Sequence, residues 1–120
     1  DWSSDVCSSD LDGTCVRDYI HVSDLAEAHV AALDHLLSGG ASAQFNVGTG
    51  TGFTVMDVLR AVERVTGKTV PYDIAGRREG DPAELVADST RLRNALGWKP
   101  VRSDLETIVK DAWVFHQKRQ

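Results

Sequence analysis

The distribution of apolar and polar residues along the chain predicts three longer helices. In the first, apolar residues recur at helical spacing between a start signal at Ser23-Asp24 and a stop signal at Gly39-Gly40. The second lies behind Thr54 and Asp57, which fit a capping box, and it stops at Gly67. Its apolar stripe consists of Val55, Val58, Leu59, Val62 and Val65. Both patterns are typical of helices that bury one face.

The third longer helix is predicted near the end of the chain. A second capping box, formed by Ser103 and Glu106, precedes an apolar face that consists of Leu105, Ile108, Val109, Ala112, Trp113 and His116. A shorter helix is expected to begin at Asp88 or Ser89 and to end at Gly97, because Pro100 prevents its continuation.

Short segments rich in β-branched and aromatic residues predict strands between these helices. They are residues 15–22 (CVRDYIHV), 44–47 (QFNV), 70–74 and, more briefly, 85–87. The chain contains no internal repeat and no obvious linker. This alternation predicts a single α/β unit, with strands too short and scattered to form a full doubly wound sheet.

A glycine-rich turn, Gly48-Thr-Gly50-Thr-Gly52, lies between the second of these strands and the second helix. A dinucleotide-binding fingerprint would need glycine where Phe53 stands, and a P-loop would need a Gly-Lys-Ser/Thr sequence. Neither is present. We therefore interpret the segment as a tight turn whose glycines let a strand and a helix pack closely.

The first eleven residues differ from the rest of the chain. Residues 1–10 (DWSSDVCSSD) show neither a helical nor an alternating period, and they lack the basic start and apolar stretch of a signal peptide. The run DWSSDVCSSDL matches the translation of a common short-read sequencing adapter. We therefore expect residues 1–11 to be a non-native or disordered segment, residues 12–120 to form the domain, and native sequence upstream of residue 11 to be missing.

Composition narrows the classes of function. The 120 residues are 42% apolar and 26% charged, with a net charge of −5, which is ordinary for a globular protein. No apolar run approaches the roughly 18 residues that would span a bilayer. The acidic balance argues against binding to nucleic acid or to a membrane surface. The spacing of Cys7 and Cys15 fits no metal-ligand motif, so we expect two reduced thiols.

The polar loop 75–82 (AGRREGDP) carries the strongest local signal for chemistry. Arginine presents a planar fork of donors that matches phosphate oxygens. Arg77 and Arg78, joined by Arg17 from a strand, could therefore bind a phosphate group. Asp81 could accept hydrogen bonds from sugar hydroxyls. On spacing alone, a solvated loop with an Arg–Asp surface pair is the stronger alternative.

No catalytic constellation is identifiable from the residues. Neither Tyr19 nor Tyr72 has the lysine four positions later that short-chain reductase chemistry would need, and the histidines show no metal-ligand spacing. Asp24 and Glu27 are interpreted as first-turn charges that the helix dipole favours.

Three blocks of sequence resemble a known family. They are residues 16–22 (VRDYIHV), 45–50 (FNVGTG) and 77–81 (RREGD), followed in unbroken order by Leu96-Gly97-Trp98 and the helix that contains Trp113. Together they resemble the C-terminal part of the UDP-glucose 4-epimerases, which are NAD-dependent members of the extended short-chain dehydrogenase/reductases. The resemblance covers about residues 12–120.

This resemblance implies a fold, a reaction and a set of ligands. The chain would be the substrate-binding C-terminal portion of an enzyme whose Rossmann domain is largely missing. In the family, bound NAD takes a hydride from C4 of UDP-galactose or UDP-glucose, the 4-keto intermediate rotates, and the hydride returns to the other face. The whole protein would be a cytoplasmic homodimer with NAD as cofactor and UDP-galactose and UDP-glucose as ligands, without nucleic-acid or membrane partners.

Carried over by position, the resemblance implies four substrate-binding residues. Arg17 and Arg78 match arginines that hold the diphosphate. Asp81 matches a carboxylate near the uridine ribose, and Val55 matches a position that lines the nucleotide pocket. Leu85 stands where some members carry a tyrosine.

The family's NAD fingerprint, its catalytic Ser/Thr and its Tyr-x-x-x-Lys pair have no counterpart in this sequence. We therefore expect no catalytic, cofactor-binding or metal-binding residue, no tight binding of NAD, and no epimerisation by the chain alone. Two alternatives stay open. One is the same portion of another nucleotide-sugar epimerase, acting on a UDP-N-acetylhexosamine or a UDP-uronate; the other is a non-catalytic nucleotide-sugar binding module.

Overall fold

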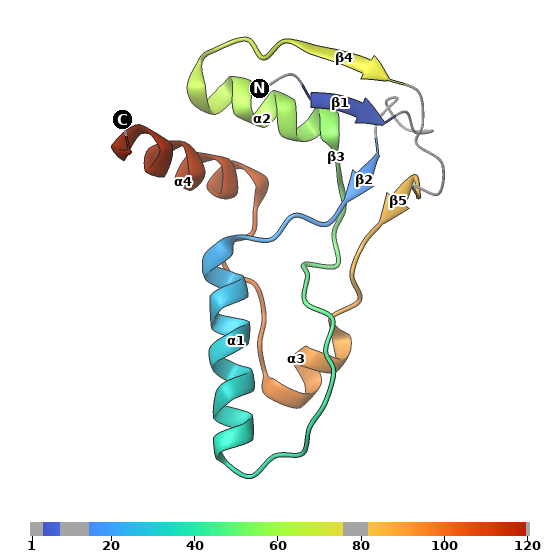
Figure 1. Ribbon diagram of the computed structural model, residues 1–120, viewed down its shortest axis with the longest axis vertical. Helices are drawn as coiled ribbons and strands as arrows, with labels where there is room; N and C mark the ends of the chain where they lie inside the picture. Colours follow the sequence, from blue (N-terminus) through green and yellow to red (C-terminus); the bar gives the residue numbers. More distant parts are fainter. Residues whose placement is uncertain (1–3, 8–14, 76–81, 120) are drawn as a thin grey trace.

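The computed structural model describes residues 4–7, 15–75 and 82–119. Its elements are, in chain order, β1 (Ser4–Cys7), β2 (Val16–Arg17), α1 (Val22–Leu37), β3 (Phe53–Thr54), α2 (Val55–Thr66), β4 (Tyr72–Ala75), β5 (Glu84–Leu85), α3 (Thr90–Leu96) and α4 (Leu105–Lys118). The shape is elongated, 50 × 37 × 20 Å. Figure 1 shows α1 and α3 in one arm, with the strands, α2 and α4 at the other end.

The described strands form two small sheets. In the first, β1 pairs in parallel with β4. In the second, β2 is the central strand, antiparallel to β3 and parallel to β5. Parallel strands need a long crossover connection, and helices α1 and α2 lie in the chain between β1 and β4. The predicted α/β class is thereby confirmed.

Residues 4–7 form strand β1, although they lie in the segment expected to be non-native or disordered. The foreign origin of residues 1–11 stays a prediction. Cys15 is buried and disulfide-bonded, so the expectation that it is a reduced thiol is wrong. The spacing of cysteines along the sequence fits no metal-ligand motif, but it carries no information about which side chains the fold brings together.

Two predicted strands are shorter than expected or absent. Of residues 15–22, only Val16–Arg17 pair in a sheet. Residues 44–47 form no strand; Phe45 and Val47 instead pack against the core cluster around Trp98. Short apolar runs therefore marked buried segments correctly, but burial of a side chain does not require that its backbone pair in a ladder.

Several predicted helix ends are confirmed, but α1 begins at Val22 with His21 as its N-cap, before the predicted start signal at Ser23-Asp24. The Thr54–Asp57 capping box is present, and Gly67 closes α2 in the left-handed conformation with φ of 70°. Gly97 closes α3 in the same way. The box predicted at Ser103 and Glu106 is wrong, because the N-cap of α4 is Asp104, which accepts a hydrogen bond from the backbone N–H of Thr107.

Two hydrophobic clusters form the described core. Ala61 of α2 packs with Leu105 and Val109 of α4, and the residues Val58, Val62 and Val65 of the α2 stripe pack against them. The second cluster joins Ala28 of α1, Leu92 of α3 and Trp98. Each cluster is small, so polar interactions between the arms carry part of the architecture.

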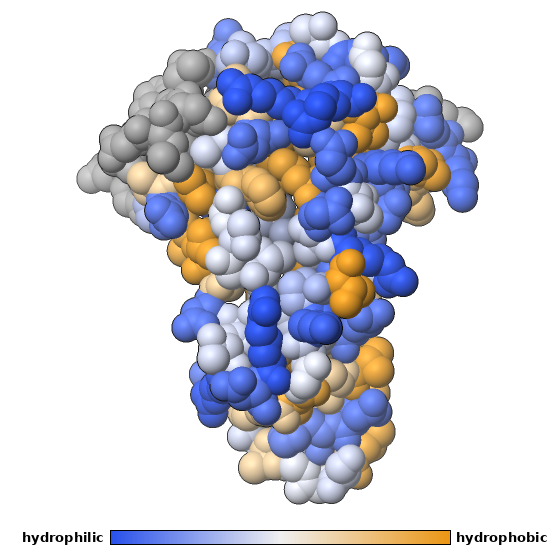
Figure 2. Space-filling view, turned by 180° about the vertical axis from the view of Figure 1, so that it is seen from behind, coloured by the Kyte–Doolittle hydropathy of each residue, from blue (hydrophilic) through white to orange (hydrophobic). Residues whose placement is uncertain are grey.

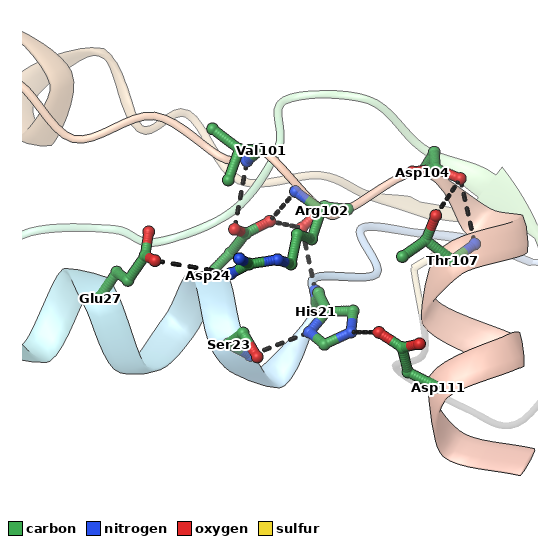
Figure 3. A network of polar contacts seen from close by, with 10 residues as sticks. His21, Ser23, Asp24, Glu27, Val101, Arg102, Asp104, Thr107 and Asp111 are labelled. Atoms are coloured by element: carbon green, nitrogen blue, oxygen red, sulfur yellow. Dashed lines mark hydrogen bonds and ion pairs between the residues drawn. The ribbon is translucent and has the colours of Figure 1, made fainter. Parts of the chain in front are cut away.

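Asp24 is the most important of these polar groups. Its side chain is fully buried, and its carboxylate accepts hydrogen bonds from the backbone N–H of Val101 (3.1 Å), the backbone N–H of Arg102 (2.9 Å) and the hydroxyl of Ser103. Its backbone carbonyl accepts from the indole N–H of Trp98 at 2.9 Å. Figure 3 shows the loop before α4 wrapped onto this carboxylate. The interpretation of Asp24 as a simple first-turn charge therefore misses its main role.

His21 extends this network to α4. Its Nδ1 accepts a hydrogen bond from the backbone N–H of Ser23 at 2.9 Å, which caps α1 and leaves the proton of the neutral ring on Nε2. Nε2 lies 2.7 Å from Oδ2 of Asp111 on α4, and the backbone N–H of His21 donates to Ser103 Oγ. The ring thus connects the start of α1 to α4 (Figure 3).

One face of α1 remains uncovered by other described residues. Val30, Leu33, Leu36 and Leu37 are each more than half exposed, opposite the side that buries Asp24 and Ala28. Figure 2 shows this apolar surface along one edge of the lower arm. None of the described helices is both long and apolar enough to cross a membrane.

The Asp24 network makes stability depend on pH. Burial raises the pKa of the Asp24 carboxyl. The hydrogen bonds from Ser103, Arg102 and Val101 together lower this pKa by more, so the net pKa lies below its ordinary value. Stability from such a group is present above the unfolded-state pKa of about 3.9 and is lost as pH falls through the lower folded-state value.

We predict that Asp24→Asn lowers the free energy of unfolding by about 2–4 kcal/mol at pH 7, because an amide cannot accept all three hydrogen bonds. The acid limb of the stability curve should also become flatter. Urea unfolding followed by circular dichroism between pH 2 and 7 measures both effects. The control is Asp34→Asn on the exposed side of α1, and an equal response of the two variants would contradict the prediction.

Candidate functional site

The central strand β2 gathers the described residues that the sequence singled out. Arg17 stands opposite Phe53 of β3 and Leu85 of β5. Val55, the first residue of α2, donates its backbone N–H to the carbonyl of Cys15 at 3.0 Å. Arg17, Val55 and Leu85 therefore meet around β2, although they are far apart in the sequence.

The other predicted residues belong to the polar loop. Arg77, Arg78 and Asp81 lie outside the described residues. The chain that follows them enters β5 at Glu84, which pairs with Val16. The segment after the polar loop thus returns to the strand that carries Arg17.

Arg17 is half-buried, whereas its neighbour Val16 is buried on the opposite face of β2. Its Nη1 donates to the carbonyl of Val16 at 2.8 Å. Arg17 also acts on Tyr19: burial raises the pKa of the Tyr19 hydroxyl, and the positive charge of Arg17 lowers it by less. Tyr19 thus stays a neutral hydrogen-bonding group at neutral pH.

Asp18, which sequence reasoning missed, organises the glycine-rich turn. Its Oδ1 accepts from the backbone N–H (3.0 Å) and the hydroxyl (2.7 Å) of Thr49. Its Oδ2 accepts from the backbone N–H of Gly50 (3.0 Å) and of Ala87 (3.2 Å). The available signal was an aspartate inside a strand-like block, because aspartate is depleted in strands.

The glycines of this turn are required by close approach. A Cβ at Gly48 would lie 2.6 Å from Asp18 Oδ2, and a Cβ at Gly52 would lie 2.3 Å from Cγ1 of the buried Val16. Gly50 has a φ of 78°, which side chains rarely adopt. The interpretation of the segment as a tight packing turn is confirmed.

The described residues do not fit the pyrophosphate of NAD. The two turn amides that could hold a phosphate, those of Thr49 and Gly50, already bind the Asp18 carboxylate. The N-terminus of α2 is closed by its own Thr54–Asp57 capping box. A dinucleotide site needs such groups open to the ligand. Among the described residues no group of three or more His, Cys, Asp or Glu could hold a metal ion either.

A hollow of about 480 Å³ lies beside the turn, lined by Thr49, Gly50, residues 86–90 and Arg93. Arg93 of α3 is held there by Nε donating to Ser89 Oγ (3.1 Å) and Nη2 donating to the Thr49 carbonyl (3.0 Å). Arg17 and Val55 do not line this hollow. It is therefore distinct from the cluster around β2.

We predict that Gly52→Ala destabilises the protein by about 1–3 kcal/mol, because the added methyl group overlaps with buried Val16. The control is Thr51→Ala, whose side chain is exposed; it should change stability by less than about 0.5 kcal/mol. Denaturant unfolding of both variants measures the difference. Equal stabilities would show that the strand and the turn do not pack as closely as described.

Comparison with known proteins gives one family and a group of close relatives. The model of the NAD dependent epimerase/dehydratase family matches residues 4–48. UDP-glucose 4-epimerase from Rhizobium leguminosarum bv. trifolii is 53% identical over 107 residues, which cover 89% of this chain and 32% of that protein.

Solved structures agree with this similarity. UDP-glucose 4-epimerase from Brucella ovis in complex with NAD superposes with a TM-score of 0.83 at 43% identity, over 89% of this chain and 34% of that one. UDP-glucose 4-epimerase from Stenotrophomonas maltophila, with bound NAD and formylated UDP-arabinopyranose, gives a TM-score of 0.85 at 41% identity, over 96% of this chain and 35% of that one.

The family match corrects the predicted identity and fold of the fragment. The prediction of a C-terminal, substrate-binding portion with the Rossmann domain largely missing is wrong, because residues 4–48 match the NAD-dependent family itself. The match places a Rossmann-like part of that family within the chain. The absence of a glycine fingerprint does not mean that the Rossmann region is absent. That region also consists of parallel strands and their helices.

The chain spans about one third of the length of the curated relatives it matches. Within that span, identity of about one half and superposition at high TM-score extend over most of the chain. The chain is thus homologous to a portion of the UDP-glucose 4-epimerases of the NAD-dependent epimerase/dehydratase family.

Proposed function

We propose that this chain is a portion of a UDP-glucose 4-epimerase and that it holds the UDP part of the substrate. The observation that carries the proposal is the 53% identity with such an enzyme over 107 residues. The whole protein would interconvert UDP-galactose and UDP-glucose. NAD supplies the redox chemistry when bound, and the described residues of this chain would bind the substrate.

Arg17 is the central residue of this proposal. A guanidinium group donates two parallel hydrogen bonds to phosphate oxygens, and its attraction for a diphosphate increases where water is partly excluded. The half-buried position of Arg17 on the central strand supports this role. Arg78 would hold the same diphosphate, and Asp81 would accept from the uridine ribose.

Val55 is proposed to line the nucleotide pocket. Its place directly after β3 and its hydrogen bond to the carbonyl of Cys15 keep it beside β2. Leu85 stands next to Arg17 and is 58% exposed, so it offers apolar contact where a tyrosine would offer a hydroxyl. The ligand class supported by these groups is a uridine diphosphate sugar, and one homologous structure holds a formylated UDP-arabinopyranose.

We predict that the chain binds UDP and that Arg17→Ala weakens the affinity about tenfold or more, because one charge-assisted contact to the diphosphate is lost. Calorimetry at low salt measures the dissociation constants. The control is Arg60→Ala on the exposed surface of α2, which should bind like the wild type. Equal affinities of the Arg17→Ala variant and the wild type would contradict the role of Arg17.

We also predict that the chain by itself does not convert UDP-galactose, because its described residues do not fit the cofactor. The purified chain is incubated with NAD and UDP-galactose, and the products are separated by chromatography. An intact UDP-glucose 4-epimerase serves as the positive control. Formation of UDP-glucose by the chain alone would overturn the prediction.

A further inference from the structure

The Asp18 carboxylate occupies a place where proteins commonly bind free anions. Successive backbone N–H groups in a glycine-containing turn form a concave site for phosphate or carboxylate. Here the N–H groups of Thr49 and Gly50 both point to Asp18, with the Thr49 hydroxyl as a third donor. The Asp18 carboxylate therefore takes the place of a free anion in this turn.

The same carboxylate ties the turn to the segment after β5. Ala87, whose N–H donates to Asp18 Oδ2, lies two residues after Leu85, the register partner of Arg17. Asp18 itself directly follows Arg17. One side chain thus connects β2, the glycine-rich turn and the end of β5, and it does so next to Arg17 along the backbone.

We propose that Asp18 is a positioning residue for diphosphate binding: it fills the anion site of the turn and thereby fixes β5 and Arg17 in the geometry that receives the ligand. This inference rests on the proposed function. Asp18 itself does not contact the ligand, because its negative charge would repel the diphosphate and its oxygens already accept four hydrogen bonds within the protein.

The geometry demands a short carboxylate at this position. An asparagine would direct an NH₂ group at backbone N–H donors, which cannot accept it. A glutamate would carry an extra methylene group into a site where even a Cβ at Gly48 would lie 2.6 Å from the carboxylate. An alanine would leave the donors unpaired but open, so a small free anion such as formate could enter.

The first test compares UDP with uridine, because their affinity ratio isolates the contribution of the diphosphate. Calorimetry on the full chain should show that Asp18→Ala lowers this ratio about tenfold. Added formate should restore it, and the backbone amide resonances of Thr49, Gly50 and Ala87 should shift on formate addition in the variant but not in the wild type. General loss of structure would lower both affinities and would not respond to formate.

A milder pair of variants keeps the test decisive if Asp18→Ala does not fold. Thr49→Val removes one donor to Asp18, whereas Thr51→Val changes an exposed neighbour that has no described side-chain bond to Asp18. The ratio should fall about threefold in the first and stay unchanged in the second.

The outcomes separate this inference from the function on which it rests. Suppose that the wild type binds UDP and that Asp18→Ala has the same UDP-to-uridine affinity ratio as the wild type. The positioning role is then overturned, and the proposed function stands. If Asp18→Ala is unfolded, an unchanged ratio in Thr49→Val leads to the same conclusion. If the wild type itself binds no UDP, both are overturned. A lowered ratio without rescue by formate also contradicts the role of an internal anion.

Discussion

The buried carboxylate of Asp24 is the constraint on which the arrangement of the elongated fold depends. A charge removed from water must be compensated, or it costs several kcal/mol. No described cation contacts this carboxylate; three donors of residues 101–103 compensate it instead. The loop before α4 must therefore lie on the start of α1. The position of α4, and with it the α2–α4 core, follows from that requirement.

Asp18, a half-buried residue directly after the central strand β2, makes hydrogen bonds of the same kind. Its carboxylate accepts hydrogen bonds from the backbone N–H groups of Thr49, Gly50 and Ala87. Such bonds have fixed directions, since the donors belong to the backbone, whereas a surface ion pair allows many side-chain conformations. The two aspartates thus fix the positions of neighbouring elements. Asp24 holds the loop before α4 against α1, and Asp18 holds together β2, the glycine-rich turn and the segment after β5. The candidate diphosphate residue Arg17 directly precedes Asp18 in the sequence.

The exposed face of α1 and the small clusters of the core agree with a chain that corresponds to about one third of its relatives' length. A chain of this size ordinarily hides most of its large aliphatic side chains. Here several leucines of α1 stay exposed among the described residues. The elements that surround β2 are nevertheless held by polar interactions within the chain itself, so the local geometry of Arg17 does not depend on that face.

The sequence by itself determined the features that depend on neighbours along the chain. These features are the Thr54–Asp57 capping box, the helix ends at Gly67 and Gly97, and the apolar stripe of α2. Each depends on residues a few positions apart, so the sequence alone predicts it. The resemblance to UDP-glucose 4-epimerases was also legible in short blocks, although the portion inferred from it was wrong. Only the tertiary structure decided the roles of Asp18, Asp24, Ser103 and Cys15. Asp18, Asp24 and Ser103 pair with groups distant in the sequence, and the helical or strand period of a segment carries no information about which distant groups the fold will bring to it. The spacing of Cys15 likewise did not show that it forms a disulfide.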